Sequence, residues 1–161
     1  EVVMWAFTLP IDLPSKNGVP SNRHARARLR NGWAHRLENA AREVGIPLAS
    51  KQPAPRGVDP VCVMVPRRHV TIIRMMAAKQ RPYDTGDGLQ GGASLFRDAM
   101  QVTRYRWRKG VAMPIGVVPG AGIVWDDSAA WSEWAYEQRR APDGKAFVVV
   151  EVRDVGEEQE R

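Results

Sequence analysis

Two short acidic segments hold the side chains best suited to chemistry in this sequence. The first is the stretch 83–90, which reads YDTGDGLQ, and the second is the pair Asp126 and Asp127 much later in the chain. Hard divalent cations such as Mg²⁺ prefer oxygen ligands, and they commonly take one or two carboxylates together with phosphate oxygens of a substrate. These residue types therefore indicate a site for a divalent metal ion.

The first segment is expected to open a helix. Apolar residues recur at helical spacing directly after it, from Leu89 to Met100, and two glycines and a proline surround the acids. Backbone N–H groups at a helix start favour carboxylates in their anionic form. Asp87 as a plain helix cap is the simpler alternative, and taken alone it is the commoner role. The second acidic pair, after apolar residues typical of the end of a buried strand, favours the metal site.

Composition indicates a packed domain with an anionic partner. The chain has 161 residues, 43% of them apolar, and six tryptophans, which together favour one domain with a full core. A net charge of +6, with 24 Lys and Arg, makes nucleic acid the partner that we expect first. Basic charge alone is not specific for nucleic acid, so this expectation needs support from the motifs.

Several classes of protein are disfavoured. Cys62 is the only cysteine, which excludes a disulfide framework and a cysteine-based zinc site. The three histidines lack metalloprotease spacing, and no apolar run reaches membrane-spanning length or resembles a signal peptide. We therefore expect a soluble, cytoplasmic protein without a membrane partner or a small-molecule cofactor.

Local patterns predict two main helices and several strands. The first helix is expected from a cap at Ser21 to about residue 44, where Gly45 and Pro47 stop it, and the second over residues 89–100. Stretches 61–65 and 70–76 form either one bent strand or a hairpin. The remaining predictions are a strand over 2–9, a strand pair at 131–138 and 146–152 around a turn at 142–144, a loop at 51–60, and a charged tail at 155–161.

Two basic segments have two interpretations each. Arg23 and Arg26 belong to an arginine-rich first helix, which is either a solvated face or a phosphate-contacting surface. Residues 104–109 (RYRWRK) interleave aromatics and cations, which suits either base stacking with phosphate contacts or an edge strand with its arginines in solvent.

The order of these motifs resembles the RusA-type Holliday junction resolvases, especially phage-encoded members. The residues that carry the resemblance are 81–90 (RPYDTGDGLQ), 96–98 (FRD), 123–127 (IVWDD) and 133–138 (EWAYEQ). The start of the chain, with FTLP at 7–10 before a basic helix, is also similar. In that family the helix entrance reads Asp-x-Asp-Asn-Leu and a later strand ends in Asp-Asp.

The resemblance implies a small α/β (α+β) fold, in which a mixed β-sheet packs against two main helices in one nuclease domain over residues 1–154. It also implies a homodimer that acts in DNA recombination and repair by cutting four-way junctions with paired symmetric nicks. The cofactor would be Mg²⁺, with Mn²⁺ as a substitute. Asp84, Asp87 and Asp127 would be catalytic metal ligands, with Asp126 beside them.

The sequence departs from the family pattern at three places. Thr85 stands where the first acid is expected, so Asp84 fills that role only if the turn is one residue longer at Gly86. A helical lysine is missing, because its candidate positions are Gly91 and Ser94, and Lys109, Arg97 or Lys79 are possible substitutes. The segment 101–122 is longer than usual and reads as an insertion.

Binding of branched DNA would depend on cations around the acidic turn. We expect Arg67, Arg68, Lys79 and Arg81 to contact phosphates, with Arg23, Arg26 and Lys109 in support. Two other functions stay open on the sequence alone. One is a junction-binding protein of the same fold without catalysis, and the other is a basic structural or interaction protein whose acids only cap helices and turns.

Overall fold

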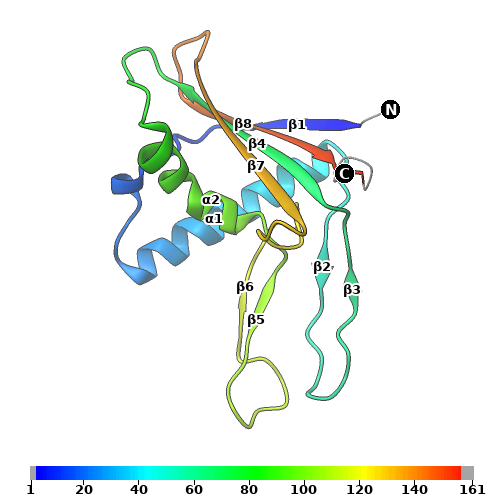
Figure 1. Ribbon diagram of the computed structural model, residues 1–161. Coiled ribbons are helices and arrows are strands. Elements are labelled where there is room, and N and C mark those ends of the chain that lie inside the picture. The colour runs from blue at the N-terminus through cyan, green and yellow to red at the C-terminus, as the bar shows by residue number, and fades with distance from the viewer. Residues whose placement is uncertain (1–2, 157–161) are drawn as a thin grey trace.

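The computed structural model describes residues 3–156, except for the side chains of Thr85 and Asp87. It shows a single mixed α+β domain, as expected from the sequence. Four strands form the main sheet in the order β1 (Met4–Leu9), β8 (Phe147–Asp154), β4 (Arg68–Met76) and β7 (Ser132–Arg140). Both main helices lie against one face of this sheet, and two hairpins project away from it (Figure 1). Within the described residues, no helix is long and apolar enough to cross a membrane.

Burial explains the strand order. In β8 every second residue, namely Val148, Val150 and Val152, is fully buried and belongs to the core beneath the sheet. In β4, Val70 and Ile72 join the same core, while Ile73 is also buried. These two strands therefore occupy the centre, and the more exposed β1 and β7 form the edges.

The predicted pairing of the last two strands is wrong. Residues 131–138 and 146–152 do form strands, but β4 lies between them, parallel to β7 and antiparallel to β8. The turn itself is present, because Gly144 has a φ of +74° and its N–H donates to the Ala141 carbonyl. The Gly144 carbonyl accepts from Ala78 N–H just beyond the end of β4. A glycine turn is a local signal, and it does not determine which strand fills the space between its arms.

Helix α1 (Arg23–Glu43) has well-defined ends. Asn22, one residue after the expected Ser21, caps it by accepting from the N–H groups of His24 and Ala25. At the other end Gly45 adopts a φ of +82°, and the N–H of Ile46 donates to the Ala41 carbonyl. This is a glycine-terminated helix end, which the sequence predicted from Gly45.

Helix α2 (Gly91–Ala99) follows directly on a π-helical turn, η2 (Thr85–Gln90). Its buried face, which includes Ala93 and Phe96, packs on α1, where the Phe96 and Trp33 rings meet edge to face at 5.4 Å. A short 3-10 turn, η1 (Lys16–Gly18), precedes α1.

The two projecting hairpins, here called the arms, come from segments that the sequence left undetermined. The first arm contains β2 (Ser50–Lys51) and β3 (Cys62–Val63), joined by the predicted loop at 51–60. Within 61–65, Cys62 and Val63 pair with β2, so this segment forms neither of the two arrangements predicted with 70–76. The second arm contains β5 (Arg104–Arg106) and β6 (Gly116–Val118), so the segment 101–122 is largely a hairpin. Of the predicted tail, residues 157–161 lie outside the described residues.

Candidate active site

Asp84 stands at the start of η2, as the sequence predicted for an acid at a helix entrance. Its carbonyl accepts from Leu89 N–H at 2.7 Å, which begins the turn, while its exposed carboxylate makes no capping bond to the helix. Asp87 lies within η2, but its side chain is outside the described residues. The Asp84 carboxylate is therefore free of a capping bond, whereas the capping alternative concerned Asp87.

The residue before Asp84 is fixed by a group of polar contacts. Gln138 of β7 accepts from Tyr83 N–H at 2.8 Å and donates to the Tyr83 carbonyl at 2.9 Å. The Tyr83 hydroxyl donates to the Leu13 carbonyl at 2.9 Å. This bidentate clamp connects the acidic turn to the sheet, so the backbone at Asp84 has a defined position.

Arg74 of β4 contacts the segment that leads into the same turn. Its side chain is buried, its guanidinium carbon lies 3.4 Å from the centre of the Tyr83 ring, and Nη1 donates to Gln138 Oε1 and the Arg81 carbonyl. Sequence reasoning missed this residue. The available signal was a single cation inside the apolar run 70–76, which usually marks a buried charge with dedicated partners.

The second acidic pair is held at the far end of α2. Ile123 and Val124 are fully buried, and their N–H groups donate to the Met100 carbonyl at 2.9 and 3.2 Å. These residues were expected to end a strand, but they form an irregular segment because the end of a helix supplies their hydrogen-bond acceptor. The burial expected for them is confirmed. Asp126 accepts from Ser128 N–H at 2.8 Å, and Asp127 is exposed.

Arg97 of α2 is the cation beside this pair. Its Nη2 lies 3.9 Å from Asp127 Oδ2, and its Nη1 donates to the Tyr136 hydroxyl at 3.0 Å. The guanidinium carbon is 4.7 Å from the centre of the Trp134 ring. Contacts with two aromatic side chains of β7 fix the guanidinium near Asp127, although both partners are partly exposed and their ion pair is weak.

The acidic turn and the acidic pair lie at different positions along β7 and do not form one cluster. Gln138 contacts the turn, while Trp134 and Tyr136, on the same face of β7, contact Arg97. Four strand residues span about 13 Å. Among the described residues, which exclude the Asp87 side chain, no three Asp, Glu, His or Cys groups are placed to share a metal ion. The structure therefore does not bring Asp84 together with Asp126 and Asp127 at one metal ion.

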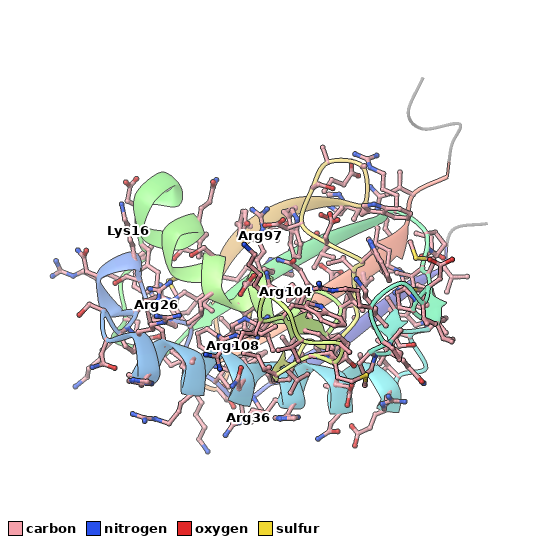
Figure 2. All side chains as sticks on the ribbon, turned by 90° about the horizontal axis from the view of Figure 1, so that it is seen from below. Lys16, Arg26, Arg36, Arg97, Arg104 and Arg108 are labelled. Carbon is pink, nitrogen blue, oxygen red and sulfur yellow. The ribbon has the colours of Figure 1, made fainter. Side chains whose placement is uncertain are left out.

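Lys16 of η1 lies against the entrance of α2. A β-carbon added at Gly91 would meet Cβ, Cγ and Cδ of Lys16 at 2.8, 2.9 and 3.0 Å. Lys16 is exposed and is seen beside α2 in Figure 2. The stem of this lysine therefore occupies the space of a side chain at 91, one helical turn after Asp87. Sequence reasoning missed it, because nothing in the local pattern of residues 14–18 indicates this contact.

The predicted phosphate ligands occupy different environments. Arg68 is fully buried, paired with Asp154 at 2.9 Å and bonded to the carbonyls of Pro47 and Ile123, so the expectation that it contacts phosphates is corrected. Arg67, at the same end of β4, donates to the Ala129 carbonyl and pairs with Glu133. Both therefore lie at the end of β4 opposite to the acidic turn, which follows the end of the strand.

The other predicted cations are exposed. Lys79 and Arg81 lie between β4 and the acidic turn, and Lys109 lies in the second arm. Arg23 and Arg26 lie in the first turn of α1, where Arg26 also donates to the Pro20 carbonyl at 3.4 Å. Of the three substitutes considered for the missing lysine, Arg97 lies beside a candidate acid, Asp127.

Comparison of the chain with known protein families, with curated proteins and with solved structures finds no match. The function must therefore be argued from the residues of this chain and from the motif order described above.

Proposed function

We propose that the protein is a Mg²⁺-dependent endonuclease that resolves four-way DNA junctions by paired symmetric nicks. The observation that carries this proposal is the arrangement of acids and cations along α2. Asp84 stands at the helix entrance, the stem of Lys16 lies against Gly91 at the start of α2, and Asp127 stands near Arg97 farther along the same helix. Carboxylates and cations at both ends of one helix suit a metal ion and a phosphate diester.

The donor chemistry fits the metal. Asp84 makes no capping bond and Asp127 is exposed, while Asp126 accepts a backbone N–H through one carboxylate oxygen. Asp84 and Asp87 at the helix entrance, and Asp126 and Asp127 at the far end of α2, would hold Mg²⁺ or Mn²⁺ at two separate positions. When bound, such an ion supplies a water of lowered pKa and neutralises charge on the phosphate.

The cations of the chain would bind the scissile phosphate. Arg97 offers a planar guanidinium whose orientation is set by Trp134 and Tyr136, and this suits a bidentate contact with phosphate oxygens. Lys16 would supply, from another part of the chain, the ammonium group that the resolvase resemblance expects at 91 or 94. We add Lys16 to the proposed site for this reason.

The proposal includes a homodimer, because two symmetric nicks require two sites related by the two-fold axis of the junction. Lys79, Arg81, Arg23 and Arg26 remain proposed phosphate contacts, and Lys109 belongs to the second arm. Arg67 and Arg68 are left out of the DNA surface because their side chains have protein partners.

The test is cleavage of a labelled mobile four-way junction and a linear duplex, with Mg²⁺, Mn²⁺ or EDTA. We expect paired nicks in the junction alone, their loss in EDTA, and their loss in Asp127→Asn. A matched control is Asp143→Asn, which changes an exposed acid in the turn between β7 and β8 and should keep activity. Cleavage retained in Asp127→Asn would contradict the assigned site.

A second candidate is a junction-binding protein without catalysis. One observation favours it: the described residues contain no group of three possible ligands for one metal ion. The same assay separates the two candidates, since this one predicts binding to the junction without nicks under every metal condition.

A further inference from the structure

The two arms enclose a groove that leads to the acidic pair. Near their tips the Arg56 N–H donates to the Ala112 carbonyl at 2.9 Å, and near their bases the Tyr105 hydroxyl donates to the Lys51 carbonyl at 2.9 Å. The space between them, here called the arm groove, has a volume of about 690 Å³ and includes Asp126 in its lining. Its size is within the range of ligand sites, roughly 300–1,000 Å³.

The arms hold most of the net positive charge. Residues 50–64 and 104–118 contain six Lys and Arg and one Asp, while the whole chain has a net charge of +6. Lys51, Arg56 and Arg104 line the arm groove, and Arg108 follows on the second arm, beyond β5. A groove with this charge selects an anionic chain.

Aromatic rings line the same groove. Trp107 is 48% exposed although it is a large apolar side chain, and Tyr105 and Trp125 contribute the other rings. Exposed aromatics between cations stack on unpaired bases, whose faces are open, whereas a duplex presents only its backbone and base edges. The groove is therefore better suited to an unpaired strand than to intact duplex.

The outer surfaces of the arms are apolar at Val61, Ile115 and Val117, which would also suit a second copy of the chain. Charge argues against a second copy in the groove itself, because two cationic grooves repel each other. A DNA strand neutralises both arms at once.

We infer that the arm groove binds an unpaired DNA strand and directs it toward Asp126 and Asp127. This inference rests on the proposed function and specifies its substrate, as branched DNA with unpaired bases next to the cleaved bond. The segment 104–118, which has no counterpart in the resolvase motifs, thereby gains a role in substrate recognition.

The experiment measures binding of fluorescein-labelled oligothymidylate by anisotropy in EDTA, where cleavage cannot occur. We expect Trp107→Ala to lose at least about fivefold in affinity, as for loss of one stacked base, and Trp107→Phe to keep most of it. Arg56→Ala, which removes a cation that lines the groove, should weaken binding and lower the slope of log affinity against log salt by about 0.7. Arg36→Ala, which removes an exposed cation from α1, is the matched control and should change binding less.

The far-ultraviolet circular dichroism spectrum checks that each variant is folded, and light scattering gives the oligomeric state. Equal binding by Trp107→Ala, Arg56→Ala and Arg36→Ala would overturn the inference, as would conversion of a dimer to monomers by the arm variants without a change in binding. Nicking that persists while the arm variants bind normally would leave the proposed function intact and reject the arm groove. Arm-dependent binding without nicks would support the groove and reject the nuclease.

Discussion

The side chain of Lys16 occupies the space that a side chain at Gly91 would fill, since a β-carbon added at Gly91 would lie 2.8 Å from Lys16 Cβ. Gly91 has ordinary helical dihedral angles, with φ −63° and ψ −41°, so its backbone does not require glycine. The reason for a glycine here is the close approach of η1. The stem of Lys16 therefore passes through the space in which a side chain at 91 would begin.

We predict that Lys16 and position 91 can exchange roles. Lys16→Met keeps most of the stem but removes the charge, and it should reduce junction cleavage about 100-fold, as does loss of one electrostatic donor in other active sites. The Gly91→Lys variant alone should be less stable than the wild-type protein, because the new side chain would collide with the stem of Lys16. Lys16→Gly combined with Gly91→Lys removes this clash and should recover cleavage in single-turnover assays. A double variant no more active than Lys16→Met would show that the ammonium group has no part in the reaction.

We predict that divalent metal stabilises the protein through the candidate acids. An ion at ten times its dissociation constant adds about 1.4 kcal/mol to the free energy of unfolding, which raises Tm by roughly 3–5 °C for a domain of this size. Asp84→Asn and Asp127→Asn should each reduce the shift measured with Mg²⁺ or Mn²⁺, while Asp143→Asn should keep it. An equal shift in all three variants would mean that the ion binds elsewhere.

Local patterns in the sequence predicted most elements of the fold but not their pairing. Helix α1 followed from its apolar spacing and Gly45, and the acidic helix entrance followed from residues 83–90. The position of β4 between β7 and β8 did not follow. Strand order depends on which strands can have a neighbouring strand at both edges, and local patterns do not show this. For the same reason, nothing near residues 61–65 indicated pairing with β2.

The candidate site was predictable where it depends on single segments and not where distant segments meet. Asp84 and Asp127 were identified from their neighbours in the chain. Lys16 reaches α2 only because Gly92 lets the Pro14 carbonyl approach the helix, and Gln138 reaches Tyr83 only through the strand order. Arg68 is an error of the opposite kind. It was predicted to contact phosphates, but its side chain is buried and pairs with Asp154.

We predict that Asp98 is important for stability through Arg30. The Arg30 side chain is only 6% exposed, and it pairs with Asp98 while also donating to the Pro119 carbonyl at 2.7 Å. Asp98→Ala leaves a buried guanidinium without its carboxylate, so the free energy of unfolding should fall by about 3 kcal/mol. The control Glu38→Ala breaks an exposed helix pair with Arg42 and should cost about 0.5 kcal/mol or less. Urea denaturation measures both, and similar losses would contradict the burial argument.

Two glycines in helices should respond in opposite directions to alanine. Gly32 is exposed in α1, and no atom lies within 4 Å of an added β-carbon, so Gly32→Ala should stabilise the protein by about 0.8–1 kcal/mol through helix propensity. At Gly92 the added β-carbon would lie 1.9 Å from the Pro14 carbonyl oxygen, which is backbone and must shift. Gly92→Ala should therefore destabilise the protein by about 1–3 kcal/mol despite the same gain in propensity.

Because the displaced segment includes Lys16, Gly92→Ala should also lower junction cleavage measured well below its Tm, whereas Gly32→Ala should not. Normal cleavage by folded Gly92→Ala would separate the packing of η1 from the chemistry and argue against a role for Lys16.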